Sequence, residues 1–212
     1  MNPPRPVHPA WPTRLPRVAI LRGVRPDEVL DHAQALVDAG FDCIEVPTNS
    51  PDWASSVARL AQAFGERVLV GAGTVTETSQ IDALVAAGGR LMVTPHTDPP
   101  LIGAAVRRGL FTAIGCATAT EAFAALRAGA QALKLFPAGA LGTAYVSALR
   151  SVLPLQVPLL AVGGVGPETL GAFLRAGCHG AGLGGELYRA GQAPQLTALR
   201  AQAFLAAWRT RA

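Results

Sequence analysis

One pattern recurs along this chain: a short apolar run followed by a longer amphipathic run, repeated eight times. The apolar runs are about 5–8 residues long and lack polar alternation, which is typical of parallel strands buried on both faces. Five amphipathic runs end at a glycine before the next apolar run, and glycine suits the left-handed residue that closes a helix. The predicted strands are residues 17–23, 43–47, 67–74, 91–95, 111–118, 132–137, 159–164 and 180–185. The predicted helices are residues 26–39, 51–64, 77–87, 99–108, 119–128, 142–152, 167–176 and 194–209.

Eight strand–helix units predict an α/β protein, a single-domain (β/α)8 barrel of the TIM-barrel type, over residues 17–212. Residues 1–16 form a proline-rich N-terminal lead. The alternative is an open, doubly wound sheet, which should carry a nucleotide-binding fingerprint after its first strand. The segment from Arg22 to Pro26 is not such a fingerprint, so the barrel is favoured.

Composition excludes several classes of protein. Hydrophobic residues make up 50% of the chain and charged residues 15%, which excludes a disordered chain. No window approaches about 18 uninterrupted apolar residues, so we expect no membrane partner. The lead lacks the apolar region of a secretory signal. Three scattered cysteines, Cys43, Cys116 and Cys178, fit no disulfide framework and favour the reducing cytoplasm.

The basic balance does not indicate a nucleic-acid partner. The net charge is +4 and the isoelectric point about 9.5, but the arginines are dispersed without a run or stripe. Nucleic-acid surfaces usually cluster their positive charge. A mild positive field instead favours collection of a small anionic substrate.

A single lysine stands out among the basic residues. Of 18 lysines and arginines only Lys134 is a lysine, and it interrupts an apolar strand near its C-terminal end, where barrel enzymes place their chemistry. Burial lowers the pKa of an amine, and a neutral amine can attack a carbonyl and form a Schiff base. The sequence therefore predicts a nucleophile. The alternatives are an ion pair with Glu45 or a chance survivor of a general preference for arginine.

Three other polar residues lie near the C-terminal ends of predicted strands. Glu45 could move a proton once an iminium has formed, and its alternative is a buried salt bridge. Arg22 could bind a substrate carboxylate through its two-pronged guanidinium, or pair with a carboxylate of the protein. Thr74 could donate its hydroxyl to the same carboxylate, or simply end a strand. We expect these side chains to meet Lys134 at the barrel mouth.

Glycine pairs stand at the C-terminal ends of the last two predicted strands. Gly163 and Gly164 end the seventh, and Gly184 and Gly185 end the eighth. Glycine turns at these places commonly bind phosphate through backbone N–H groups. The four histidines show no metal-ligand spacing and the cysteines no paired motif, so we expect neither a metal nor another cofactor.

These same segments resemble the class I 2-keto-3-deoxy-6-phosphogluconate (KDPG) and -galactonate aldolase family, from about residue 15 to residue 191. The segments that carry the resemblance are residues 19–23, 45–51, 71–75, 115–123, 131–137 and 161–165. The resemblance implies Lys134 as Schiff-base nucleophile, Glu45 as acid and base, Arg22 and Thr74 at the pyruvyl end, and the four glycines at the phosphate. It also implies a homotrimer, a phosphorylated keto-deoxy sugar acid as substrate, and pyruvate as product.

Two segments of this chain resemble one branch of the family more than the other. Gluconate-type members read Glu-Val-Thr-Leu-Arg after the second strand and Pro-Thr-Gly-Gly on the seventh. This chain has Pro47-Thr48-Asn49 and Ala161-Val162-Gly163-Gly164, which look like the galactonate branch. Val162 replaces a threonine whose hydroxyl could contact the substrate's C4 hydroxyl, where the two sugars differ. The resemblance therefore implies the galactonate substrate, with the gluconate epimer as the alternative.

Two readings from other classes remain open. A phosphate-binding barrel can be an isomerase or synthase without a covalent step, or a ligand-binding protein without catalysis. Relatives often have serine where this chain has Gly185, so a hydroxyl contact to phosphate is lost and backbone donors would have to serve.

Overall fold

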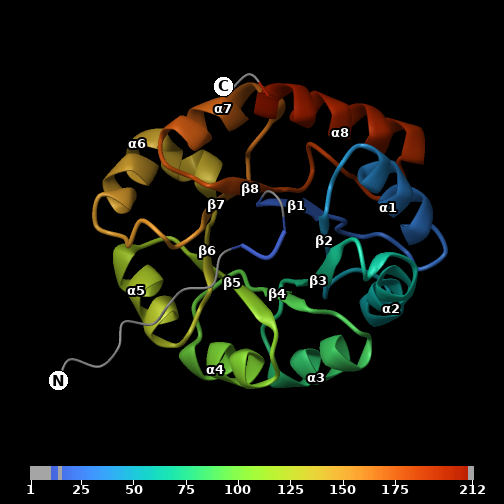
Figure 1. Cartoon of the computed structure of the whole chain (residues 1–212), viewed down its shortest axis with the longest axis horizontal. Coiled ribbons are helices and arrows are strands. Elements are labelled where there is room, and N and C mark those ends of the chain that lie inside the picture. Colours follow the sequence, from blue (N-terminus) through green and yellow to red (C-terminus); the bar gives the residue numbers. More distant parts are fainter. Residues whose placement is uncertain (1–10, 14–15, 210–212) are drawn as a thin grey trace.

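The computed structural model describes residues 11–13 and 16–209, and eight parallel strands close into a barrel in chain order (Figure 1). Each strand pairs with its neighbours in sequence, and the eighth pairs with the first. The closed ring confirms the predicted fold and excludes the open sheet. The strands are β1 (Arg17–Ile20), β2 (Cys43–Pro47), β3 (Leu69–Gly73), β4 (Leu91–Val93), β5 (Phe111–Cys116), β6 (Ala132–Leu135), β7 (Leu159–Val162) and β8 (Gly180–Leu183).

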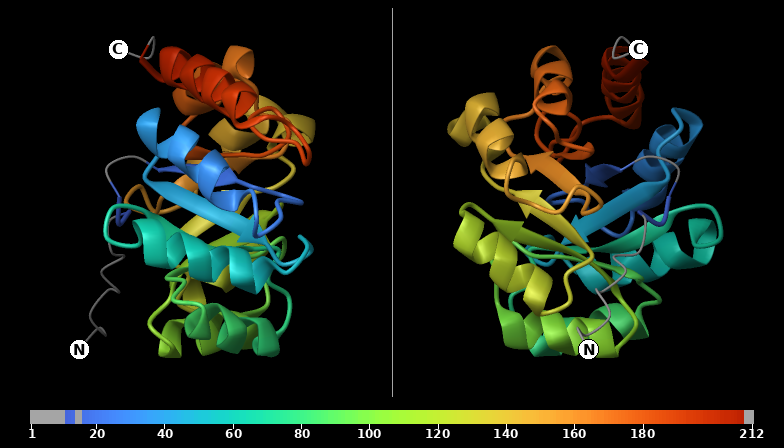
Figure 2. Two further views of the ribbon diagram at one scale, coloured as in Figure 1. Left: turned by 90° about the vertical axis from the view of Figure 1, so that its right-hand side faces the viewer. Right: turned by 60° about the vertical axis from the view of Figure 1, so that its left-hand side comes forward.

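A helix follows each strand, and the helices form a ring outside the barrel (Figure 1). The two further views in Figure 2 show the same arrangement, with the strands inside and the helices around them. The ring closes where α8 packs against α1 and α7. The helices are α1 (Val29–Asp38), α2 (Trp53–Phe64), α3 (Thr78–Ala86), α4 (Pro99–Arg107), α5 (Ala119–Arg127), α6 (Ala138–Arg150), α7 (Pro167–Arg175) and α8 (Pro194–Arg209).

The alternation of strand side chains divides the core in two. One set of alternate positions meets inside the barrel, where Val18, Ile20, Cys43 and Ala132 belong to one apolar cluster. The other set packs outward against the helices in a larger cluster. Glu45 and Lys134 lie two residues beyond Cys43 and Ala132 on the same strands. Because strand side chains repeat every two residues, both point into the barrel.

Most element boundaries agree with the sequence prediction within one or two residues, and three do not. The first strand ends at Ile20 rather than at residue 23, because the chain turns through Gly23 with φ of 83°. The first helix begins at Val29, three residues after Pro26. The sixth begins at Ala138 rather than at residue 142, and Gly142 kinks it with φ of 79°.

The predicted helix-closing glycines are confirmed by the backbone. Gly40, Gly88, Gly109, Gly129 and Gly177 all have φ between 74° and 113°. A side chain in this conformation is strained, so glycine sets the point at which each helix ends.

Of the proposed lead, residues 1–10, 14 and 15 lie outside the described residues. Trp11 packs edge-on against Phe111 at the start of β5, with ring centroids 5.3 Å apart. The carbonyl of Pro16 accepts a hydrogen bond from the backbone N–H of Ala181 at 3.0 Å. These described residues therefore contact the N-terminal end of the barrel.

No helix in the part of the chain that the structure describes combines the length and apolar character needed to cross a bilayer.

Gly71 in β3 offers a test of the barrel's close packing. A Cβ there would lie 2.1 Å from the carbonyl oxygen of Leu91, so we expect Gly71→Ala to destabilise the fold by about 2 kcal/mol or more. Gly103→Ala in α4 is the control, and should be neutral or stabilise by up to about 1 kcal/mol. Denaturant unfolding measures both; equal effects of the two substitutions would contradict the expectation.

Candidate active site

A cavity of about 530 Å³ opens at the C-terminal ends of the strands. This volume lies within the range of about 300–1,000 Å³ typical of small-molecule sites. Its wall includes an arginine, a lysine and two glycine turns, which suit an anionic ligand. The lining residues are Ile20, Arg22, Thr74, Pro95, Lys134, Phe136, Val162, Gly163, Gly164, Val165, Gly182, Gly184, Gly185 and Glu186.

Lys134 places its amine at the base of this cavity. The side chain is 5% exposed, and its Nζ lies 5.2 Å from the centre of the Phe136 ring. Burial lowers the pKa of Lys134 below its ordinary value; the negative charge of Glu45 acts in the opposite direction, and the positive charge of Arg22 lowers it further. The arrangement therefore increases the fraction of neutral, nucleophilic amine.

Glu45 is the most deeply buried carboxylate of the site. It is 1% exposed, and burial raises its pKa to about 7 although Lys134 and Arg22 both lower it. Its Oε2 atom has no hydrogen-bond partner among the described residues. A carboxyl group with a pKa near neutrality can both accept and return a proton.

Gly73 makes room for this carboxylate. A Cβ at residue 73 would lie 1.5 Å from Glu45 Oε2. Any side chain there would displace the carboxylate, so a glycine at the end of β3 is a condition for the position of Glu45 on β2.

The four polar side chains expected at the barrel mouth are divided between two adjoining cavities. Arg22, Thr74 and Lys134 line the main cavity, but Glu45 lines a smaller cavity of about 10 Å³. The two cavities share Lys134 as well as three other residues, Ile20, Val162 and Gly182. Glu45 therefore lies beneath the mouth, because β2 continues two residues beyond it.

Lys134 and Glu45 do not form the structural ion pair that was the alternative to a catalytic role. Within the described part of the chain, no hydrogen bond or ion pair within 4 Å joins Lys134 Nζ to the carboxylate of Glu45. The two groups influence each other's pKa through space without satisfying each other's hydrogen-bonding capacity.

Arg22 and Thr74 form one polar edge of the cavity. The Arg22 guanidinium donates to Asn49 Oδ1 at 2.7 Å and to Thr74 Oγ1 at 3.3 Å. Thr74 has a positive φ of 57°, and Thr48 donates to its carbonyl oxygen at 2.7 Å. A positive φ is uncommon for threonine, so Thr48 helps hold a strained backbone that places the Thr74 hydroxyl beside Arg22.

The glycine turn after β7 lies across the cavity. Gly163 and Gly164 have φ of 87° and 71°, a conformation that side chains rarely adopt. A Cβ on Gly163 would also lie 3.0 Å from the Phe136 ring. The Gly163 carbonyl accepts from the N–H of Gly139 at 2.8 Å, so this acceptor is already engaged.

Unlike the turn after β7, the turn after β8 does not require glycine at residues 184 and 185. Gly184 and Gly185 have ordinary φ values, and a Cβ on either would meet nothing within 4 Å. The carbonyl of Gly184 accepts from the N–H groups of Leu187 and Tyr188, each at 2.8 Å. Serine at residue 185 would thus fit sterically, and its absence in this chain is not imposed by space.

The described residues contain no group of three histidine, cysteine, aspartate or glutamate side chains that could hold a metal ion.

The comparisons with known proteins agree with this geometry. Residues 12–200 match the family model described as KDPG and KHG aldolase. The chain belongs to this aldolase family. It is 53% identical over 199 residues to 2-dehydro-3-deoxy-6-phosphogalactonate aldolase of Escherichia coli (strain K12), covering 94% of this chain and 97% of the relative.

A second relative and a solved structure extend the match. A Rhizobium meliloti (strain 1021) protein named "Probable 2-dehydro-3-deoxy-6-phosphogalactonate aldolase" is 42% identical over 200 residues, with 94% of each chain covered. The solved structure described as "Native KDPGal structure" superposes with a TM-score of 0.94 at 52% identity, covering 95% of this chain and 98% of that one. This aldolase family member is therefore similar to its relatives over almost its whole length.

Sequence reasoning missed several residues of the site in this aldolase. Thr48 and Asn49 fix Thr74 and Arg22, Gly73 admits Glu45, and Phe136 flanks Lys134. Their neighbours along the strands gave a signal only for Gly73, which ends an apolar strand beside a predicted site residue. Thr48 and Asn49 depend on contacts between segments far apart in sequence, whereas Phe136 is only two residues from Lys134 and its ring position depends on side-chain direction.

The charges around the amine of this aldolase predict two opposite shifts. Because Glu45 raises and Arg22 lowers the pKa of Lys134, Glu45→Gln should lower that pKa and Arg22→Met should raise it. The chain has one lysine, so carbon-13-labelled lysine gives one side-chain signal to follow by NMR as pH is varied. Shifts in the same direction for both variants would contradict the arrangement.

Proposed function

We propose that this aldolase cleaves 2-dehydro-3-deoxy-6-phosphogalactonate to pyruvate and glyceraldehyde 3-phosphate. The observation that carries the proposal is the sole lysine, buried at the base of a cavity that has an arginine on one side and glycine turns on the other. The names of the two relatives support the galactonate substrate.

Lys134 begins the reaction by attacking the C2 ketone. The neutral amine adds to the carbonyl, and the resulting carbinolamine takes up one proton and loses water, which leaves an iminium ion. The lowered pKa of Lys134 supports this step, because an ammonium ion has no free electron pair. The iminium then accepts the electron pair released from the breaking C3–C4 bond, so the scheme calls for neither a metal nor another cofactor.

Glu45 moves the protons of the cleavage. It takes the proton of the C4 hydroxyl as the C3–C4 bond breaks, which gives the aldehyde product and an enamine on Lys134. It then returns a proton to C3, and hydrolysis of the iminium releases pyruvate. Glu45 Oε2, which is buried without a hydrogen-bond partner among the described residues, is the atom that would exchange this proton, directly or through one water molecule.

The two ends of the cavity orient the substrate. Arg22 and Thr74 bind its carboxylate, with the guanidinium held by Asn49. The backbone N–H groups of Gly163, Gly164, Gly184 and Gly185 bind its phosphate. The engaged carbonyls of Gly163 and Gly184 support this assignment, since a carbonyl facing the site would repel a phosphate oxygen.

Val162 selects between the epimers in this proposal. Its side chain lines the cavity between Lys134 and the glycine turn, and it offers no hydrogen bond to the C4 hydroxyl. The gluconate epimer, with the same mechanism, is the second candidate substrate.

We infer a cytoplasmic homotrimer. The family resemblance supports the trimer, and Val152 and Leu155, which are 56% and 78% exposed in the loop between α6 and β7, offer apolar surface for association. The three cysteines are buried and scattered along the chain without the spacing of a disulfide framework, which supports the reducing cytoplasm.

The covalent step has a direct test. Borohydride reduction in the presence of pyruvate should add one reduced pyruvyl group to Lys134, located by mass spectrometry. Lys134→Arg should abolish both the adduct and cleavage, because a guanidinium forms no Schiff base. Thermal unfolding serves as the folding control. Unchanged cleavage by the arginine variant would refute the mechanism.

The same experiment separates the proposal from the other two classes of function. An isomerase or synthase without a covalent step, or a ligand-binding barrel, would give no adduct in the wild-type protein.

The role of Val162 has a separate test. Val162→Thr should raise kcat/KM for the gluconate epimer, relative to the galactonate epimer, by about tenfold, the worth of about one hydrogen bond. Val165→Thr, the same change at another cavity residue, is the control and should leave the ratio unaltered. An unchanged ratio in Val162→Thr would remove that side chain from epimer selection.

A further inference from the structure

The segment that carries Gly184 and Gly185 runs from β8 to α8 without a strand or helix of its own, over residues 184–193. Such a segment has many backbone conformations, and binding a ligand through its N–H groups requires one of them. The contacts that select this conformation come from side chains at its far end.

Gln192 is the centre of these contacts. Its Oε1 accepts from the Arg189 backbone N–H at 3.0 Å and from the Arg200 guanidinium at 2.9 Å. Its Nε2 donates to the Leu187 carbonyl at 3.1 Å and to Thr197 Oγ1 at 2.7 Å. One amide thus uses two acceptor positions and two donations, which is its full capacity.

Two arginines connect this centre to Gly185. The Arg189 Nε donates to the Gly185 carbonyl at 3.0 Å, and Arg200 donates to the same oxygen at 3.5 Å. The Gly184 carbonyl is engaged by Leu187 and Tyr188. Both carbonyls of the glycine pair are therefore held by donors of the protein, which fixes the orientation of the two peptide groups.

The network is anchored in the core behind the segment. Thr197 and His32 are buried, and Thr197 Oγ1 lies 2.8 Å from His32 Nδ1. Because Gln192 donates to this hydroxyl, the hydroxyl proton is free to go to Nδ1, which then accepts. Burial lowers the pKa of His32 and so favours the neutral ring that this requires.

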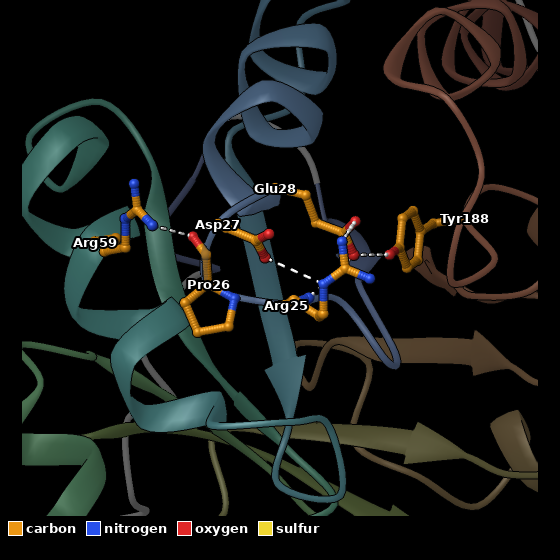
Figure 3. Close-up of polar contacts among 6 residues, drawn as sticks. All are labelled: Arg25, Pro26, Asp27, Glu28, Arg59 and Tyr188. Atoms are coloured by element: carbon orange, nitrogen blue, oxygen red, sulfur yellow. Dashed lines mark hydrogen bonds and ion pairs between the residues drawn. The ribbon is translucent and has the colours of Figure 1, made fainter.

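Tyr188 ties the same segment to the start of α1. Its hydroxyl donates to Glu28 Oε1 at 3.3 Å, and Glu28 pairs with Arg25 at 3.1 Å (Figure 3). Figure 3 also shows Arg59 donating to the carbonyl of Pro26, which ties the loop before α1 to α2. The segment is thus braced from α1 and from α8.

We propose that Gln192 is a positioning residue for the phosphate end of the substrate, because it fixes the peptide groups of Gly184 and Gly185 through Arg189, Arg200 and Leu187. This inference rests on the proposed function, in which these glycines bind the phosphate. Gln192 itself does not line the cavity and acts only through the backbone. Loss of its contacts releases the segment, and binding the phosphate then costs the entropy of ordering it.

The test compares a phosphorylated with an unphosphorylated substrate. Gln192→Leu should raise KM for 2-dehydro-3-deoxy-6-phosphogalactonate about tenfold with little change in kcat. The reason is that the ordered conformation of the segment loses the stabilisation that about one to two hydrogen bonds provide. Its kcat/KM for unphosphorylated 2-dehydro-3-deoxygalactonate should stay within about twofold of the wild type. The inhibition constant of inorganic phosphate should rise by the same factor as KM.

Two further variants complete the design. Gln195→Leu, the same change at an exposed position of α8, should leave all constants unaltered. Thr197→Val removes one partner of Gln192 with little change of shape, and should raise the same KM by a smaller factor. It keeps the inference testable if Gln192→Leu does not fold, which thermal unfolding decides.

The outcomes separate this inference from the proposed function. Equal losses on both substrates, or no loss on either, would overturn the role of Gln192 while borohydride trapping at Lys134 still supports the aldolase chemistry. A wild-type protein that does not favour the phosphorylated substrate would overturn the phosphate assignment and this inference together. Absence of the adduct in the wild type would overturn the proposed function itself.

Discussion

The desolvation free energy of two buried ionisable groups is the interaction on which the chemistry of this protein depends. Lys134 and Glu45 point into the same barrel, and burial moves their pKa values toward each other: the amine downward and the carboxyl upward to about 7. In water both groups would be fully charged at neutral pH. Inside the barrel a neutral amine and a carboxyl group that exchanges its proton become accessible. The chemistry proposed for the site needs these two states.

The barrel makes this pair possible by omitting side chains around it. Gly73 leaves room for the Glu45 carboxylate, and Gly182 leaves room beside Val162. Gly163 and Gly164 adopt a conformation that other residues avoid, which brings backbone to the cavity wall. The strands therefore carry few reactive side chains, and the glycines leave the space in which those side chains and the ligand can lie.

The residues outside the cavity explain how a short chain keeps its loops in place. Asn49 holds Arg22, Thr48 holds the strained Thr74, and Gln192 holds the segment after β8. Each of these polar side chains bonds to a segment distant in sequence or to a backbone carbonyl. Hydrogen bonds from loop residues thus set the orientation of the site side chains and of the segment after β8, while the strands fix only where each loop begins.

The sequence alone determined the eight strand–helix units, the helix-closing glycines and the isolated lysine, because each depends on local periodicity or on one residue type. It also singled out Glu45, Arg22 and Thr74 as candidate site residues, since each lies near the end of an apolar run. Only the tertiary structure placed Glu45 beneath the cavity and brought Gln192 to Gly185 through Arg200. These relations depend on barrel closure and side-chain direction, which join residues that no local pattern connects.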